Sequence, residues 1–304
     1  MEFNGTDKRY NQFSAYLKNK FGAKVYKITI DAGFSCPNRD GTISTGGCIF
    51  CDESGSFSQA HSNILSIEEQ INTGAETLSK RFKAEKFMAY FQAYSNTYKP
   101  VDELKQIYDA SLNHKDIVGI SIGTRPDCVD EEKLKLISSY NKNYYTWLEY
   151  GLQSVHNKTL KKINRGHDYE TFLNAYKKTK EYGINVCVHV ILGLWETHDE
   201  MMETAKRLAE LKVDGVKIHM LCGIKNVHKH VDNVDNYFPR RCSPMFTTSP
   251  APIVINRSPC AQLFKRKLSI SSKVGKYSHG VPSSWICFWR SWEEIPRSSV
   301  SRAA

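Results

Sequence analysis

The sequence lacks any run of 18 or more apolar residues, which argues against a transmembrane helix. Its opening residues, MEFNGTDKRYNQF, contain no apolar core of the type that a secretory signal requires. We therefore expect a cytoplasmic protein with no membrane partner. In that reducing compartment, the nine cysteines are expected to be metal ligands or free thiols rather than a disulfide framework.

The first 222 residues also lack an excess of charge of one sign, because 29 Lys and Arg face 28 Asp and Glu. Residues 223–304 contain 13 basic and 4 acidic residues, so an argument for nucleic acid from charge concerns this tail alone. The tail also holds seven of the ten prolines and 13 serines, without clear periodicity. We predict a core domain over 1–222 and an atypical, poorly ordered basic tail over 223–304.

Six apolar, β-rich runs alternate with segments of helical period, after an amphipathic opening helix at about 8–20. The runs are 25–30, 87–94, 116–123, 145–153, 184–194 and 214–221, and the helical segments are 66–82, 100–114, 130–141, 169–183 and 199–211. This alternation predicts a parallel α/β sheet covered by helices. It does not decide between a partial barrel and an open doubly wound sheet, but ligands bind at the carboxyl ends of the strands in both.

Residues 31–53, DAGFSCPNRDGTISTGGCIFCDE, follow the first strand and form what we call the cysteine loop. The loop contains Cys36, Cys48 and Cys51, with eleven residues between the first pair and two between the second. A CxxC pair lets two thiolates face one centre, and the glycines of the loop let a third thiolate fold back toward it. The spacing therefore points to a metal site at the carboxyl end of the sheet.

Three interpretations of the loop stay open at this point. A structural zinc ion requires four ligands, and Cys128 or His61 would have to supply the fourth, although neither belongs to a second close pair. An iron–sulfur cubane held by three cysteines leaves one iron free to bind substrate or cofactor. Three cysteines without a metal are the third interpretation, which their clustering beside a strand disfavours. Cys187 and Cys222, like Cys128, lack paired spacing and are predicted to be packing residues.

Together with further blocks of sequence, the loop resembles the radical S-adenosylmethionine (SAM) superfamily. More narrowly, it resembles the YhcC/YtqA-type group, related to the elongator catalytic subunit and to oxygen-independent coproporphyrinogen oxidase. The superfamily spacing is usually C-x3-C-x2-C, whereas this group has a long first gap, as found here. The resemblance covers about residues 8–221 and rests on KITIDAGFSCPNRDG, GGCIFC, AYFQAYSNTY, IGTRPDC, LEYGLQS, INRGHD and HVILGLWE, in this order. It implies a partial (βα)6 TIM-like barrel preceded by a helix.

The resemblance also implies a cofactor and a reaction. Cys36, Cys48 and Cys51 would ligate a [4Fe–4S] cluster, whose open iron would chelate the amino and carboxylate groups of SAM. One electron, from a donor such as a flavodoxin or ferredoxin, would then cleave SAM to a 5′-deoxyadenosyl radical. The substrate is unknown. Relatives act on tRNA or on a tetrapyrrole, so RNA modification is an analogy at the level of the fold.

The resemblance assigns SAM contacts at the ends of the strands. Phe50 would lie against the adenine, with ordinary loop packing as the alternative. Gln92 begins the region that contacts the SAM amino group, and Gln153 would contact the ribose or the methionine part. Arg165 would pair with the SAM carboxylate, since a guanidinium matches a carboxylate bidentately. The alternative for Arg165 is a surface arginine.

Glu149 and Ser154 accompany Gln153 in the block LEYGLQS and are assigned to the same SAM site. His189 would face the ribose, with a satisfied core histidine as the alternative. The segment ILGLWE departs from the adenine motif of the group, because Trp195 replaces a proline and a glycine is lacking before Glu196. In the block IGTRPDC, residues 125–127 are predicted to line the substrate side, with a turn as the structural alternative.

A different class of function is a non-catalytic protein stabilised by zinc, whose basic tail contacts nucleic acid. The tail also carries a separate hypothesis. Enrichment in Ser, Pro, Arg and Cys after about residue 222 is typical of out-of-frame translation, so this segment is expected not to be homologous to the C-terminal region of the family. A genuine lineage-specific tail is the alternative.

Overall fold

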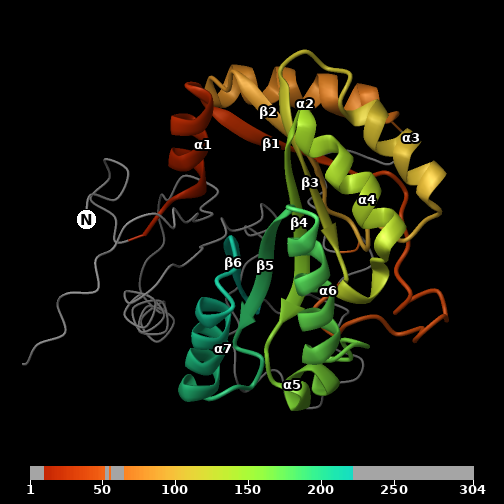
Figure 1. Cartoon of the computed structure of the whole chain (residues 1–304), viewed down its shortest axis with the longest axis vertical. Coiled ribbons are helices and arrows are strands. Elements are labelled where there is room, and N and C mark those ends of the chain that lie inside the picture. The colour runs from red at the N-terminus through yellow and green to blue at the C-terminus, as the bar shows by residue number, and fades with distance from the viewer. Residues whose placement is uncertain (1–9, 52–54, 56–64, 222–304) are drawn as a thin grey trace, which may run out of the picture.

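The computed structural model of the 304-residue chain describes residues 10–51, 55 and 65–221 (Figure 1). Six parallel strands form one sheet in the order β1-β2-β3-β4-β5-β6, so each strand pairs with its neighbours in sequence. The sheet curls into a half-barrel with helices on its outer face (Figure 1). A doubly wound sheet would reverse its strand order at a switch point, so this order confirms the partial barrel.

The strands are β1 (Val25–Ile30), β2 (Lys86–Phe91), β3 (Ile117–Thr124), β4 (Tyr145–Gln153), β5 (Asn185–Leu192) and β6 (Gly215–Met220). The helices are α1 (Phe13–Phe21), α2 (Ile67–Phe82), α3 (Val101–Ser111), α4 (Glu131–Ser139), α5 (Asn157–Lys162), α6 (Tyr169–Glu181) and α7 (His198–Glu210). Two short 3-10 helices, η1 (Pro126–Cys128) and η2 (Tyr140–Lys142), precede and follow α4.

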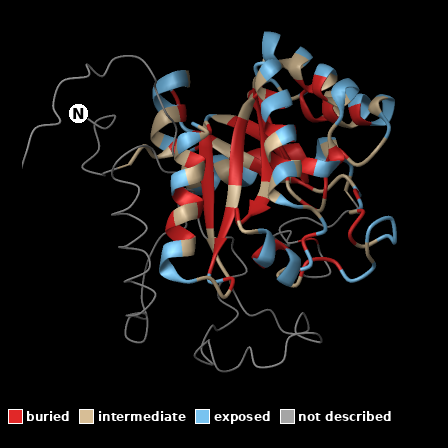
Figure 2. Cartoon of the chain, turned by 60° about the horizontal axis from the view of Figure 1, so that its bottom comes forward, coloured by how far each residue is buried: buried red, intermediate tan, exposed pale blue. Residues whose placement is uncertain are grey.

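The long helices begin at polar caps that fix the junctions with the strands. Ser66 and Glu69, three residues apart as a capping box requires, form one at the start of α2, and Thr197 with Glu200 forms a second one at α7. Asp130 and Asp168 each accept a hydrogen bond from one backbone N–H group in the first turn of the helix that follows, α4 and α6 respectively. The strands between these helices are buried on both faces, which explains their continuous apolar runs (Figure 2).

Helix α1 packs across the amino-terminal end of the half-barrel. The ring of Phe13 makes an edge contact with Trp147 near the start of β4, with centroids 5.4 Å apart. Tyr145 donates a hydrogen bond of 3.1 Å to the hydroxyl of Tyr16. The Nζ atom of Lys27 lies 5.3 Å from the centre of the Phe13 ring. This packing leaves the carboxyl ends of the strands, on the opposite side, as the end where a site can form.

The structure differs from the predicted elements at strand ends and in short helices. Strand β2 ends at Phe91 instead of residue 94, because Tyr94 has φ 60° and the backbone N–H of Asn96 donates to the carbonyl of Gly123. Helix α5 was not predicted, since its six residues are too few for a periodic pattern. Predictions for residues 1–9 and 223–304 lie outside the described residues. Within the described part, no helix is long and apolar enough to cross a membrane.

Candidate functional site

The cysteine loop lies at the carboxyl end of the half-barrel and is fastened to the turn after α5. The backbone N–H of Ile49 donates to the carbonyl of Ile163 over 3.2 Å. The side chain of Asn164 donates to the carbonyl of Gly47 over 2.7 Å, and Gly47 donates to the carbonyl of Asn38 over the same distance. This turn, residues 163–166, we call the clamp. It joins two segments that are more than a hundred residues apart in sequence.

The three loop cysteines are free thiols, with Cys48 buried and Cys36 and Cys51 half-buried. Across residues 10–51, 55 and 65–221, a different trio (Glu149, Cys187 and His189) is the one set of three His, Cys, Asp or Glu ligands that all lie within 4.8 Å of one another. This trio lies on β4 and β5 and shares no residue with the cysteine loop.

The proposed fourth zinc ligands do not complete such a site within the described residues. Cys128 lies in η1, and burial followed by the nearby Asp127 charge raises the pKa of its thiol to about 12. His61 lies outside the described residues. Cys128 behaves as the buried packing residue that its isolated position in the sequence predicts.

Three arginines surround the cysteine loop. Arg39 donates from Nη2 to the carbonyl of Cys51 over 2.7 Å, and Arg165 donates from Nη1 to the sulfur of Cys48 over 3.5 Å. Burial opposes the charge of Arg125, but two hydrogen bonds to the Asp127 carboxylate hold the pKa of Arg125 above its usual value. Guanidinium groups in these positions suit an anionic centre held by three thiolates.

The end of β4 presents a buried acceptor beside this loop. The pairing of β4 with β5 shifts its register between Gly151 and Gln153, and Gln153 takes a left-handed φ of 78°. In the part of the chain that the structure describes, its Oε1 atom is buried without a hydrogen-bond partner. Ser154 follows and donates to the carboxylate of Glu196. An orphaned buried acceptor at a strand end fits a ligand that carries donors, such as SAM.

An apolar cluster adjoins the loop, at the carboxyl end of β5. Four buried side chains form it, and Phe50, Trp195 and others pack against it; the four are Leu160, Ile163, Ile191 and Leu194. Trp195 has a positive φ of 58°, which is unusual for a bulky residue. The adenine motif of the group has a glycine beside this position. The Nζ atom of Lys162 lies 4.4 Å from the centre of the Trp195 ring. The position of Phe50 is compatible both with adenine contact and with loop packing.

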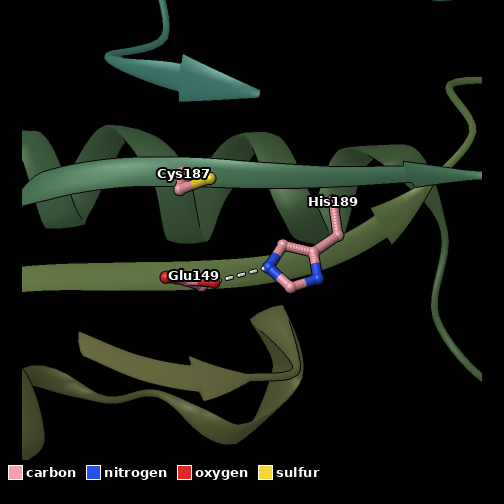
Figure 3. Close-up of side chains that lie close together, drawn as sticks. All are labelled: Glu149, Cys187 and His189. Carbon is pink, nitrogen blue, oxygen red and sulfur yellow. Dashed lines mark hydrogen bonds and ion pairs between the residues drawn. The ribbon is translucent and has the colours of Figure 1, made fainter. Parts of the chain in front are cut away.

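Deeper in the half-barrel, charged and polar side chains from all six strands meet in what we call the lumen cluster. Its members are Lys27, Tyr90, Ser121, Glu149, Cys187, His189 and Lys217. Glu149 is fully buried and accepts hydrogen bonds from Lys27 and from Ser121 over 2.5 Å. It also accepts one from Nε2 of His189 over 2.8 Å (Figure 3). Its second oxygen lies 3.9 Å from the Nζ atom of Lys217. The carboxylate is the hub of the cluster.

The charges of the lumen cluster fix the proton on His189. Burial would raise the pKa of Glu149, but the two ammonium groups hold it well below its usual range. Burial, followed by the charge of Lys217, lowers the pKa of His189 to about 4. The imidazole is therefore neutral at pH 7 and donates its Nε2–H to the Glu149 carboxylate. This leaves Nδ1 as an acceptor, on the side of the ring toward the carboxyl end of β5 (Figure 3).

Glu149, Cys187 and His189 resemble a metal-binding trio by distance alone. The ammonium groups of Lys27 and Lys217 already interact with the same carboxylate and would repel a cation there. We therefore interpret the trio as part of a hydrogen-bonded network and assign it no ion.

Comparison with known proteins decides the family. Residues 40–231 match the radical SAM superfamily. The chain is 42% identical over 220 residues to the uncharacterized protein YtqA of Bacillus subtilis, covering 72% of this chain and 68% of that protein. It is also 42% identical over 220 residues to protein YhcC of Escherichia coli, covering 72% and 70%. The chain belongs to the radical SAM superfamily.

The radical SAM fold is also found in a solved relative. Coproporphyrinogen III oxidase (HemN) of Escherichia coli, a radical SAM enzyme, aligns with a TM-score of 0.51 at 15% identity, covering 94% of this chain and 61% of that one. At this identity the likeness supports the fold alone. The predicted superfamily and the predicted YhcC/YtqA-type group are thus confirmed.

The structure brings most of the residues predicted from this radical SAM resemblance to the carboxyl end of the strands. Gln153 ends β4 and Ser154 follows it, Arg165 donates to the sulfur of Cys48 in the cysteine loop, and Phe50 is part of that loop. Gln92 directly follows β2 and is half-buried. His189 and Glu149 lie deeper, in the lumen cluster, and Glu149 has no exposed side-chain surface. Their contacts with SAM stay predictions.

Two residues of this radical SAM barrel were missed by the sequence reasoning. Lys27 and Lys217 line the interior, with side chains 9% and 2% exposed. The signal was present, since each is a single charged residue inside an otherwise apolar run, VYKITI and GVKIHM. A lone lysine on a strand buried on both faces is unusual unless it has a partner inside.

We expect the metal-free chain to lose stability as the pH falls from about 6.5 toward 4. The folded pKa of His189 is about 4, below its usual 6.5, so the unfolded chain binds the proton first. The contribution of His189 to stability is fully present above pH 6.5 and should decrease by about 1.4 kcal/mol per pH unit between the two pKa values. Urea unfolding at pH 7.5, 6.0 and 5.0 measures this slope.

The His189→Asn variant provides the control for this pH dependence. The variant removes one titrating group, so its free energy of unfolding should depend less steeply on pH than that of the wild type. His219 and His167, whose pKa values burial also lowers, should preserve the remainder of the slope. Equal slopes in the two proteins would contradict the assignment of a neutral His189.

Proposed function

We propose that the chain is a radical SAM enzyme whose cysteine loop holds a [4Fe–4S] cluster through Cys36, Cys48 and Cys51. The observation that carries the proposal is the position of this loop: three free thiols at the carboxyl end of a half-barrel, with the guanidinium groups of Arg39 and Arg165 donating to Cys51 and Cys48. When bound, the cluster and SAM supply a 5′-deoxyadenosyl radical by reductive cleavage.

The residues around the loop would bind and orient SAM. We propose that the free Oε1 of Gln153 accepts a donor of SAM and that Nδ1 of His189 accepts a ribose hydroxyl. Phe50 and its apolar cluster would exclude water from the adenine. Gln92, Ser154 and Arg165 are proposed as further contacts; their family positions support this, as does the hydrogen bond from Arg165 to Cys48 of the loop.

Glu149 acts in this proposal as a positioning residue. Its carboxylate is fully buried and already accepts three hydrogen bonds, so it holds the tautomer of His189 rather than contacting SAM directly.

The remaining parts of the proposal concern partners and boundaries. We propose a radical SAM core over residues 1–222, an electron donor of the flavodoxin or ferredoxin class, and a substrate for which RNA is the first class to test. The analogy to tRNA-modifying relatives supports RNA only at the level of the fold.

Anaerobic reconstitution of the full chain with iron and sulfide tests this function. A brown protein with about four irons and four sulfides, which releases 5′-deoxyadenosine from SAM after reduction with dithionite, would support it. A colourless protein that keeps stoichiometric zinc and never cleaves SAM would replace it with the zinc-stabilised binding protein. RNA capture by that colourless form would then test the alternative directly.

A further inference from the structure

We infer that Asn38 and Arg165 tune the reduction potential of the bound cluster by donating two N–H···S hydrogen bonds to the Cys48 thiolate. The inference rests on the proposed function, because it requires a cluster on the cysteine loop. Both donors are side chains of this chain, and both contact the sulfur of the most buried loop cysteine. Cys48 is 6% exposed, whereas Cys36 and Cys51 are half-buried.

The amide of Asn38 is held with its nitrogen toward the sulfur. Its Nδ2 donates to Sγ of Cys48 over 3.5 Å and to the carbonyl of Asn164 over 2.6 Å. The carbonyl acceptor fixes the orientation, because a flipped amide would set two oxygens against each other. The side chain has no exposed surface, so this geometry is not shared with solvent.

A glycine of the clamp leaves room for that amide. Gly166 has φ 75°, and a Cβ atom there would lie 2.7 Å from Oδ1 of Asn38. In the described part of the chain, this Oδ1 is buried with no hydrogen-bond partner. A buried amide oxygen without a hydrogen-bond partner destabilises the fold. Such a cost is expected where the amide serves a function, here the contact of its nitrogen with the sulfur.

Arg165 approaches the same sulfur from the clamp side. Its Nε and Nη2 atoms donate to the carbonyl of Gly151 over 2.9 and 2.5 Å, and Nη1 donates to Sγ of Cys48 over 3.5 Å. A Cβ atom on Gly151 would lie 2.8 Å from Nη2, so this guanidinium position requires a glycine there. The residue is 5% exposed. Two N–H groups remain for a carboxylate, so the predicted contact with SAM is compatible with this role.

These hydrogen bonds have a defined electrostatic consequence. Reduction adds one negative charge to the cluster and its thiolates, and N–H donors stabilise that charge more than they stabilise the oxidised state. The low dielectric around a buried sulfur strengthens the effect. Both donors should therefore raise the potential and bring the cluster within reach of a milder reductant.

The test is a redox titration monitored by electron paramagnetic resonance, without SAM, on the reconstituted full chain. We compare the wild type with Asn38→Leu, which keeps the shape and removes the donor, and with Arg165→Lys, which keeps the charge and loses the fork. Each variant should lower the reduced-to-oxidised ratio at a fixed potential at least tenfold, a shift of about 59 mV for one electron. Gly151→Ala, which displaces the guanidinium, should shift the potential in the same direction.

Lys161→Gln is the matched control, because it removes an exposed positive charge from neighbouring α5 without touching the loop. Its potential should equal that of the wild type. Full iron content with unchanged potentials in Asn38→Leu, Arg165→Lys and Gly151→Ala would overturn this inference and leave the proposed function standing. A wild type that binds no cluster would overturn both. Thermal unfolding of each variant shows that the compared proteins are folded.

Discussion

Replacing Cys48 with alanine should abolish iron incorporation and SAM cleavage together. Cys48 is the most buried of the three loop thiols and receives hydrogen bonds from two side chains, so no solvent-borne ligand can easily take its place. A cluster that loses one of three protein ligands has two exposed irons and is expected to decompose. Iron and sulfide analysis, the visible spectrum and the yield of 5′-deoxyadenosine measure the outcome.

Cys128→Ala is the matched control for this substitution. Cys128 is similarly buried, lies in η1 outside the cysteine loop and is predicted to be a packing residue. This variant should bind the same amount of iron as the wild type and cleave SAM at a similar rate. Equal iron content in Cys48→Ala and in Cys128→Ala would contradict the proposed ligand set.

Replacing Glu149 with leucine should destabilise the fold by about 3–5 kcal/mol. The carboxylate is fully buried and interacts with Lys27, Lys217 and His189, so its removal leaves two ammonium groups inside the barrel without this counter-charge. Breaking one partner of a buried ion pair costs far more than the pair itself contributes. Urea unfolding of the metal-free chain at pH 7.5 gives the free energy of unfolding.

The triple variant Lys27→Met, Glu149→Leu, Lys217→Met tests whether charge, rather than volume, causes this loss. Replacing a whole buried ionic network by apolar side chains of similar size is often close to neutral. The triple variant should therefore recover most of the stability that the single variant loses. A single variant that costs less than about 1 kcal/mol, or a triple variant that is less stable than the single one, would refute the account.

Much of the fold could be predicted because it depends on local patterns. Apolar runs set the strands, and the Ser66 capping box marked the start of α2 within one residue. The choice of a partial barrel could not be made from periodicity, since strand order is a long-range property; it came from the resemblance and is confirmed by the sheet. The end of β2 was missed because Asn96 hydrogen-bonds to β3, which no local pattern reveals.

The candidate site likewise has one part that the local sequence reveals and one part that only the fold brings together. The cysteine loop was found because its three cysteines lie within sixteen residues of one another, from Cys36 to Cys51. The lumen cluster was not found, because Lys27 and Glu149 are 122 residues apart and meet only through the curl of the sheet. Glu149 was assigned to the SAM site from its sequence block; the structure places its carboxylate at the buried hub of the lumen cluster, and its contact with SAM stays a prediction.

The clamp has a consequence for the order in which the site comes into being. Cys48 leaves the ribosome about 115 residues before Arg165, which corresponds to roughly 6–23 s of synthesis. Because each strand pairs with the one made before it, β1 to β3 can assemble during this interval. During that time the three loop cysteines have been synthesised, but the clamp residues that enclose Cys48 have not. The cysteines of the site are therefore synthesised first, and the clamp residues that enclose Cys48 follow later.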